Sequence, residues 1–232
     1  MEHLDMVKDK QQVEPIIEAY VGEYASGKSE NAVNRAIYLR KQGLPVTIVD
    51  LDTVEPCYTL RPIKQELEDL GMEVVAWETR DTTGLGEAGN VIKASMRWVL
   101  RRKGNIIMDV GYGVHGARIF NLVEGAFENP YLKIIAVLNM SRPFTSTVDN
   151  ILEYVQTLGR VDAVLNNTHM AEETTVQLVQ RGAEGVTEAA KRIGVPVVAT
   201  SAVTEIAEQI GPVDCMGNPV WKLERIMPRT FW

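Results

Sequence analysis

Residues 22–29 read Gly-Glu-Tyr-Ala-Ser-Gly-Lys-Ser, a complete G-x-x-x-x-G-K-S motif. In this motif the backbone N–H groups surround a polyphosphate, the lysine reaches the terminal phosphates, and the serine hydroxyl is placed to ligate Mg²⁺. The pattern therefore predicts a phosphate-binding loop. The predicted binding residues are Gly22, Glu23, Tyr24, Ala25, Ser26, Gly27, Lys28 and Ser29.

The segments on both sides of this motif favour the same interpretation. An apolar run at 16–21 predicts a strand before the loop, and apolar residues at helical spacing from Ala32 to Leu39 predict a helix that ends at Gly43. A helix that begins at the phosphate site adds the partial positive charge of its amino end to anion binding.

Two further predicted strands end in carboxylates that suit a magnesium and phosphate site. Asp50 ends the run at 46–50 and Asp52 follows it, whereas Asp109 ends the apolar run at 106–108. Such acids can hold Mg²⁺ and orient a water molecule. An aspartate after a strand is also a common turn or helix-capping residue, so each acid taken alone leaves that alternative open.

Short runs rich in Val and Ile alternate with longer amphipathic segments along the chain. This alternation predicts an α/β fold: a doubly wound, mostly parallel sheet with helices on both faces. The predicted strands are 16–21, 46–50, 73–76, 105–110, 134–139, 163–166 and 195–199, and the predicted helices are about 59–70, 87–102, 114–127, 145–158 and 172–193. In such folds ligands bind beyond the carboxyl ends of the strands.

Length and composition predict one globular domain over residues 1–232. No linker divides the chain. Residues 1–14 are expected to form a polar N-terminal arm, and residues 211–232, rich in proline and glycine, an irregular C-terminal tail. Within that tail, residues 220–227 have some amphipathic character, and we expect them to pack in the core or contact another subunit.

Charge and the pattern of apolar residues exclude several classes of function. The net charge of −7 argues against a broad nucleic-acid-binding surface. The sequence shows no signal peptide and no apolar run long enough to span a membrane, so we expect a cytoplasmic protein without membrane contact. Cys57 and Cys215 lie far apart without a C-x-x-C pattern, which gives no support for a metal site or a disulfide.

The spacing of residues 22–29, 50–52 and 109–113 resembles the MinD/ParA/CobQ-CobB group (SIMIBI class) of P-loop ATPases. The likeness runs from about residue 16 to about residue 200. It implies a P-loop NTPase fold that binds ATP or ADP with Mg²⁺. Lys28 would bind the β- and γ-phosphates, and Ser29 the Mg²⁺. Asp52 would position the attacking water, Asp50 would support the metal or water network, and Asp109 would hold Mg²⁺ through a water.

The same resemblance suggests a contact to the base. Asn166 ends a predicted strand where the group carries an asparagine that contacts adenine; a turn-forming role is an equal alternative. Asn139, at the end of the preceding strand, is a second candidate of the same kind. The sequence Asn166-Asn167-Thr168-His169 differs from the Asn-Lys-x-Asp motif of GTP-binding proteins, which favours ATP over GTP.

One residue departs from the pattern of the group. Many members carry a lysine directly after the first glycine of the loop, where it reaches the nucleotide of a partner subunit, whereas this chain has Glu23. A carboxylate cannot neutralise phosphate charge. We expect Glu23 to face solvent or a neighbouring arginine; the alternative is contact with a second substrate or partner.

Three functions follow from this pattern. The first is a Mg²⁺-dependent ATP-binding protein and slow ATPase whose nucleotide state switches a homodimer or a client protein, for example in the maturation of a metallocofactor enzyme. The second is an ATP-dependent kinase, ligase or synthetase that acts on a small acid. The third is a module that binds ATP without hydrolysing it.

Overall fold

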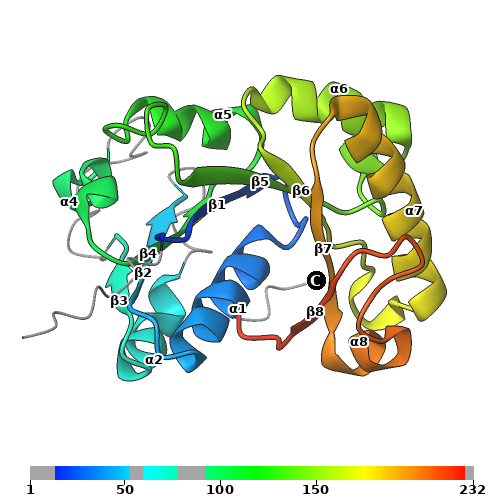
Figure 1. The fold of residues 1–232 in the computed structure, drawn as a ribbon, viewed down its shortest axis with the longest axis horizontal. Helices are drawn as coiled ribbons and strands as arrows, with labels where there is room; N and C mark the ends of the chain where they lie inside the picture. The colour runs from blue at the N-terminus through cyan, green and yellow to red at the C-terminus, as the bar shows by residue number, and fades with distance from the viewer. Residues whose placement is uncertain (1–13, 53–59, 78–91, 228–232) are drawn as a thin grey trace, which may run out of the picture.

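The computed structural model describes residues 14–52, 60–77 and 92–227. The described strands form one eight-stranded sheet with the order β3-β2-β4-β1-β5-β6-β7-β8, and each neighbouring pair is parallel (Figure 1). The strands are β1 Ile17–Gly22, β2 Val46–Leu51, β3 Glu73–Val75, β4 Asn105–Val110, β5 Leu132–Leu138, β6 Ala163–Asn166, β7 Val197–Val203 and β8 Val220–Leu223. The predicted doubly wound parallel fold is confirmed.

The helices follow the strands as an α/β fold requires, but several are shorter than the sequence predicts. They are α1 Lys28–Lys41, α2 Lys64–Asp69, α4 Ala94–Arg97, α5 Gly113–Ala117, α6 Val148–Leu158, α7 Val176–Ile193 and α8 Thr204–Ile210, with 3-10 turns at η1 Arg61–Ile63, η2 Val99–Arg101, η3 Arg118–Asn121, η4 Pro143–Thr145 and η5 Ala171–Glu173. The predicted arm 1–14 and the first part of the predicted helix 87–102 lie outside the described residues, apart from Glu14.

The helix predicted over 114–127 was wrong in extent, and so were two predicted helix starts. The α-helical part ends at Ala117, a 3-10 turn follows, and Gly125 takes a left-handed conformation that interrupts a helix. Helices α6 and α7 begin three and four residues later than predicted because Thr147 and Thr175 cap them, each accepting a hydrogen bond from a first-turn N–H.

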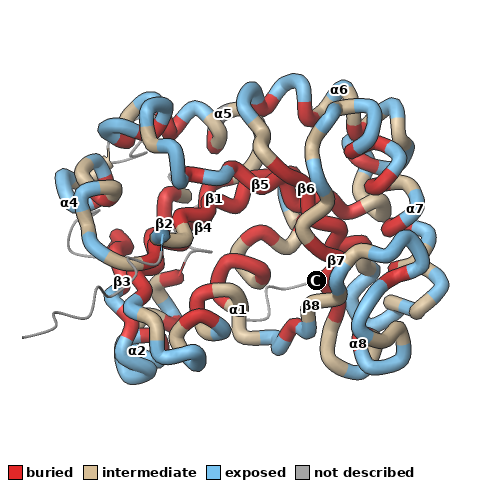
Figure 2. Tube along the Cα trace, in the orientation of Figure 1, coloured by how far each residue is buried: buried red, intermediate tan, exposed pale blue. Residues whose placement is uncertain are grey.

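Both faces of the sheet are covered by apolar side chains of helices. Residues of α4, η3, α6 and α7 pack on one face, and residues of α1 and α2 pack on the other. The strands between them are buried along most of their length, as Figure 2 shows. A sheet buried on both faces explains the nearly continuous apolar runs of β1, β2 and β4.

The C-terminal segment differs from the irregular tail that the sequence predicts. Residues Val220–Leu223 form β8, which pairs in parallel with β7. Trp221, Ile226 and Met227 pack against the core cluster beneath α1, so the expected packing of residues 220–227 in the core is observed for these three side chains. Phe231 and Trp232 lie outside the described residues.

The register of the sheet brings the ends of the central strands together. Asp109 of β4 pairs with Asp50 of β2 on one side and with Tyr20 of β1 on the other. The loop that follows β1 therefore starts beside both acidic strand ends. Among the described helices, none has the length and apolar character that crossing a membrane would require.

Candidate functional site

The loop between β1 and α1 has the geometry of an anion-binding turn. Gly27 precedes α1 in a left-handed conformation, and no side chain caps the amino end of this helix. The first N–H groups of the helix thus lack a side-chain acceptor, and the helix dipole favours negative charge there. A Cβ at Gly22 would clash with the Val137 carbonyl oxygen and the Ser26 hydroxyl, so this turn requires glycine.

The side chain of Lys28 bends back onto the phosphate loop. Lys28 is buried, and its Nζ donates to the carbonyl oxygen of Glu23 at 3.1 Å. The Ser26 N–H donates to the same carbonyl at 3.2 Å, and the buried Ser26 hydroxyl has no hydrogen-bond partner. The ammonium group therefore lies within the loop, where it can meet a phosphate.

Tyr24 and Ala25 occupy the outer part of the loop. The Tyr24 ring is 39% exposed and meets the Tyr112 ring edge-on, with centroids 5.4 Å apart. Ala25 has a positive φ of 53°, which is uncommon for a residue with a Cβ. Ala25 also lines a cavity that opens beside the loop.

Asp109 lies beside the amino end of α1 in a state that suits a bound cation. Burial raises the pKa of its carboxyl from 3.8 to about 7; a hydrogen bond from Ser29 and the charge of Lys28 lower the pKa, and Asp52 raises it. Its Oδ1 atom is buried without a hydrogen-bond partner. An orphaned carboxylate oxygen beside a serine hydroxyl is the oxygen-donor set that Mg²⁺ uses together with phosphates and water, so these residues fit the ion.

Asp50 and Asp52 take different positions although they are two residues apart. The carboxylate of Asp50 is fully buried and accepts hydrogen bonds from the N–H groups of Asp52 at 3.0 Å and Leu60 at 3.2 Å. Asp52 is partly exposed, and its carboxylate approaches Gly111 so closely that a Cβ there would lie 2.9 Å from Oδ1. Asp50 fixes the turn, and Asp52 faces the loop after Asp109.

Glu23 does not face solvent, and it forms no ion pair with an arginine of the described residues, contrary to the favoured expectation. It is buried at 7% exposure, and its two carboxylate oxygens lie 3.4 Å from the Phe144 N–H and 3.2 Å from the Thr145 hydroxyl. Its charge also raises the pKa of Tyr154, after burial as the larger cause. Glu23 therefore joins the phosphate loop to η4, a contact that connects residues more than a hundred positions apart.

The two asparagines at the end of β6, Asn166 and Asn167, have different environments. Asn166 is fully buried, and its Nδ2 donates to the Val179 carbonyl and the Thr200 hydroxyl while its Oδ1 accepts from Thr168. These internal bonds favour the structural alternative over a contact to adenine.

The neighbouring residue Asn167, which the sequence analysis missed, contacts the phosphate loop instead. Its Nδ2 donates to the Ser26 carbonyl at 2.7 Å, and its Oδ1 accepts from the Ser201 hydroxyl at 2.9 Å. A Cβ at Gly27 would clash with this amide group. The available signal was the alternation of side chains along a strand, since consecutive residues point to opposite faces.

Asn139 also has a structural environment. Its Oδ1 accepts from the N–H groups of Ser141 and His169, and its Nδ2 donates to the His169 carbonyl oxygen. These bonds tie the end of β5 to the loop after β6. Asn139 therefore shapes the loops that surround the site.

A cavity of about 520 Å³ opens beside the phosphate loop, at the carboxyl ends of β6 and β7. Its lining includes Ala25, Gly27 and Glu30, residues 167–171 and residues 201–203. Parallel α/β sheets bind ligands in such crevices. The cavity is therefore placed to receive a group attached to phosphates held at α1.

Basic side chains line this cavity and affect its histidine. Arg142 and Arg225 both line it, and the Nε atom of Arg142 is buried without a hydrogen-bond partner. Burial first, and the charges of Arg142 and Arg225 next, lower the pKa of His169 to about 4. His169 is therefore neutral at physiological pH, so that of the three basic side chains only the two arginines carry a charge.

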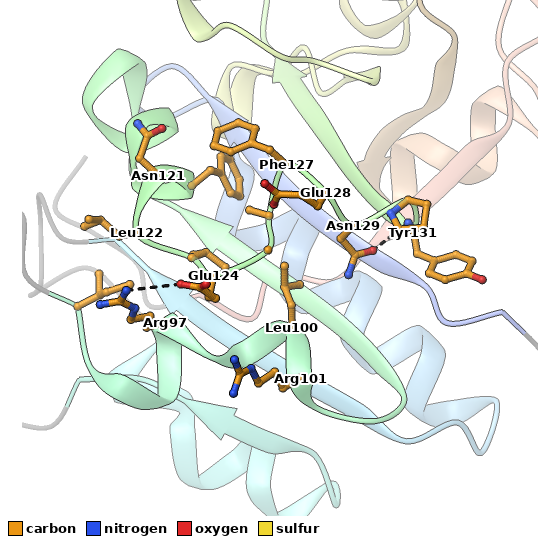
Figure 3. Close-up of a pocket in the computed structure, with 16 residues that line it drawn as sticks. Arg97, Leu100, Arg101, Asn121, Leu122, Glu124, Phe127, Glu128, Asn129 and Tyr131 are labelled. Atoms are coloured by element: carbon orange, nitrogen blue, oxygen red, sulfur yellow. Dashed lines mark hydrogen bonds and ion pairs between the residues drawn. The ribbon is translucent and has the colours of Figure 1, made fainter.

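A larger hollow of about 950 Å³ lies away from these residues (Figure 3). It is lined by η2 and by residues 120–131. These segments precede β4 and β5, so they lie toward the amino ends of the strands, whereas the phosphate loop lies at the carboxyl end of β1. Arg97 and Glu124 face each other across part of it, with Nη2 and Oε2 3.5 Å apart (Figure 3). None of the predicted site residues lines this hollow.

Solved structures with a similar fold include three FtsY proteins. The signal recognition particle receptor FtsY from Elizabethkingia anophelis in complex with GDP matches with a TM-score of 0.54 and 16% identity, covering 86% of this chain and 61% of that one. The cell division protein FtsY from Thermotoga maritima matches at 0.53 and 13% identity, over 83% and 63% of the two chains. Chloroplast FtsY from Physcomitrella patens matches at 0.52 and 16% identity, over 81% and 58%.

This chain has a P-loop NTPase fold. At these identities the likeness concerns the fold, which agrees with the class that the sequence resembles. The chain spans only about three fifths of the length of the FtsY structures. Neither a protein-family model nor a curated protein sequence matches it.

Proposed function

We propose that this protein is a Mg²⁺-dependent ATP-binding protein and slow ATPase whose nucleotide state switches a homodimer or a partner protein. The observation that carries the proposal is the uncapped amino end of α1, where Lys28 and Ser29 lie beside the orphaned carboxylate oxygen of Asp109. Anionic phosphates with a bound metal ion would supply an acceptor for the uncapped N–H groups of the helix and a cation for the orphaned oxygen of Asp109.

The roles of the side chains follow from their positions. Lys28 and the loop N–H groups bind the β- and γ-phosphates, and Asp52, at the edge of the site beside Gly111, orients a water toward the γ-phosphate. Asp50 holds Asp52 in place, because its carboxylate accepts a hydrogen bond from the Asp52 N–H group. Ser29 and Asp109 would hold Mg²⁺, which supplies neutralisation of phosphate charge when bound.

The lining of the cavity supports our proposal of adenine rather than guanine. A guanine-specific site needs an acceptor for the N–H donors of the guanine edge, and the Asn-Lys-x-Asp motif supplies a carboxylate for that purpose. Here the loop after β6 carries the neutral His169 instead. Glu30 also lines the cavity, and its Oε1 accepts hydrogen bonds from the N–H groups of Ile226 and Met227. The FtsY structure with GDP makes GTP the competitor to test.

The expected partners follow from the same resemblance. A second copy of the chain or a client protein would contact the face that carries the phosphate loop. An example of such a client is an enzyme whose metallocofactor is being matured. Because Glu23 is bonded within its own chain to η4, it is not available to reach a partner's nucleotide, and hydrolysis without the signature lysine is expected to be slow. We place the protein in the cytoplasm.

A second candidate function has one observation in its favour. Arg142 lines the cavity with a buried, unpartnered Nε, and Arg225 lines the same space. Two guanidinium groups suit the carboxylate of a small acid, as an ATP-dependent kinase, ligase or synthetase would require. In that case phosphate release would depend on the added acid.

Phosphate release and oligomeric mass, measured together, test the switch. With Mg-ATP we expect slow phosphate release by the wild-type protein and a larger mass than with ADP. Asp52→Ala should lose at least about 90% of turnover, as expected for removal of a water-positioning group, while it retains ATP binding and the larger mass. Turnover by Asp52→Ala equal to that of wild type, or one mass in both nucleotides, would contradict the proposed switch. Release only with an added acid would favour the second function.

A further inference from the structure

The chain after β8 lies along the first turns of α1 and is held there by two polar side chains. Asn34 pairs with the backbone of Glu224: its Nδ2 donates to the Glu224 carbonyl and its Oδ1 accepts from the Glu224 N–H, each at 2.9 Å. These two hydrogen bonds resemble those that one strand of a sheet makes with its neighbour. We call residues 224–227 the closing segment.

Glu30 holds the other end of the closing segment. Its Oε1 accepts from the Ile226 N–H at 2.6 Å and from the Met227 N–H at 3.3 Å. Burial raises the pKa of Glu30 and is the largest cause, whereas these backbone hydrogen bonds lower it. A partly buried carboxylate that receives two N–H groups forms strong bonds, because charge-assisted hydrogen bonds exceed neutral ones.

The closing segment also forms part of the cavity wall. Glu30 and Arg225 both line the cavity of about 520 Å³. Arg225 extends from the closing segment to η5, where its Nη1 lies 2.5 Å from the Glu172 Oε1. Since Ala171, the neighbour of Glu172, lines the cavity as well, this ion pair joins the closing segment to the part of the lining that follows β6.

We infer that the closing segment positions the lining of the 520 Å³ cavity, where the nucleotide base would bind. Glu30 and Asn34 hold the segment on α1, and this docking and nucleotide binding strengthen each other. The inference rests on the proposed function. Glu30 directly follows Ser29, so the element that receives the phosphates also holds the segment that completes the pocket. Coupling of this kind is reciprocal: whatever docking adds to nucleotide affinity, nucleotide adds to docking.

Hydrogen exchange of the Ile226 and Met227 amides in the full chain tests the docking. We compare wild type, Glu30→Ala and Glu30→Gln, each alone and with Mg-ATP or Mg-GTP, and measure nucleotide affinity on the same samples. Glu205→Ala is the matched control, because Glu205 is an exposed glutamate in the first turn of α8 that does not line the cavity. Circular dichroism establishes that each variant is folded.

The expected results are reciprocal. Nucleotide should slow exchange of both amides in wild type by about tenfold, and Glu30→Ala should speed their exchange without nucleotide and weaken affinity by about tenfold each, as loss of charge-assisted hydrogen bonds implies. Glu30→Gln, which keeps an acceptor oxygen, should fall between wild type and Glu30→Ala, and Glu205→Ala should match wild type.

Two outcomes would overturn the inference. One is exchange of the two amides that nucleotide leaves unchanged in wild type. The other is faster exchange in Glu30→Ala at unchanged affinity, which would make Glu30 a purely structural residue. If wild type binds neither nucleotide, the proposed function fails and the coupling with it, whereas exchange without nucleotide still reports whether Glu30 holds the segment. If Glu30→Ala does not fold, the wild-type and Glu30→Gln arms decide.

Discussion

Asp109 shows how a buried acid can trade stability for ligand binding. Its pKa of about 7 lies above the value of 3.8 for the free side chain. Between these values the folded protein holds a proton that the unfolded chain has released, so the free energy of unfolding falls as the pH rises through this window. A carboxylate whose ionisation is costly because it is buried becomes an effective ligand once a cation lies beside it.

We predict that Asp109→Asn removes most of this pH dependence. For the nucleotide-free wild-type protein, the contribution of Asp109 to the free energy of unfolding should fall by about 2 kcal/mol between about pH 5 and pH 8, whereas the variant lacks that loss and is the more stable protein at pH 8. Urea denaturation at the two pH values measures the difference.

The control for this measurement is Asp149→Asn, since the Asp149 side chain is 82% exposed. That variant should keep the pH dependence of wild type. An effect of Asp109→Asn that is the same at both pH values would show that the buried carboxyl does not change its protonation between pH 5 and pH 8, and would contradict this prediction.

Single residues also mark where sequence reasoning stops. The motif located Lys28 and Ser29 beside Asp109 because all three follow local rules, a loop pattern and a strand end. The environment of Glu23 could not be predicted, because it depends on Phe144 and Thr145, which are 121 and 122 positions away. Nor could sequence alone decide which of Asn166 and Asn167 faces the loop, since that depends on the phase of one short strand.

At the level of elements, helix α1 connects the phosphate loop with the edge of the sheet. Arg35 of this helix pairs with Glu18 of β1 through two hydrogen bonds, at 2.9 and 3.0 Å, and its guanidinium lies 5.1 Å from the centre of the Trp221 ring of β8. Tyr20 donates a third bond to Glu18. One side chain thus joins three elements beneath the site.

We predict that Arg35→Ala lowers the free energy of unfolding by about 3 kcal/mol, because it leaves the buried Glu18 without its cation. Arg192→Ala is the matched control: Arg192 of α7 pairs with Glu188 and Asp149 but is half exposed, so its loss should cost about 0.5 kcal/mol or less. Urea denaturation measures both. Equal losses for the two variants would contradict the importance given to the buried pair.

The elements also separate what periodicity predicts from what it misses. The strands 105–110 and 163–166 were predicted with their observed bounds, because they are continuous apolar runs in a sheet buried on both faces. Strand β8 was missed: its four residues follow Pro219 in a segment rich in glycine and proline, and its pairing with β7 is a tertiary contact. The short 3-10 turns were also beyond a helical pattern.

At the level of the whole molecule, the parallel sheet gathers the candidate site from distant parts of the chain. The phosphate loop follows β1, Asp109 ends β4, and Asn167 and Ser201 belong to the ends of β6 and β7. The closing segment after β8 completes the cavity from the last described residues. The fold therefore explains why site residues as far apart in the sequence as Gly22 and Arg225 meet at the carboxyl ends of the strands.

The most direct test of this account is equilibrium binding of Mg-ATP and Mg-GTP to the wild-type protein and to Lys28→Ala. Lys41→Ala is the matched control, because Lys41 is an exposed lysine in the last turn of the same helix. We predict that wild type and Lys41→Ala bind ATP equally and more tightly than GTP, and that Lys28→Ala loses about a hundredfold in affinity, near 3 kcal/mol. Equal ATP affinity of Lys28→Ala and wild type, or no binding by wild type, would contradict the account.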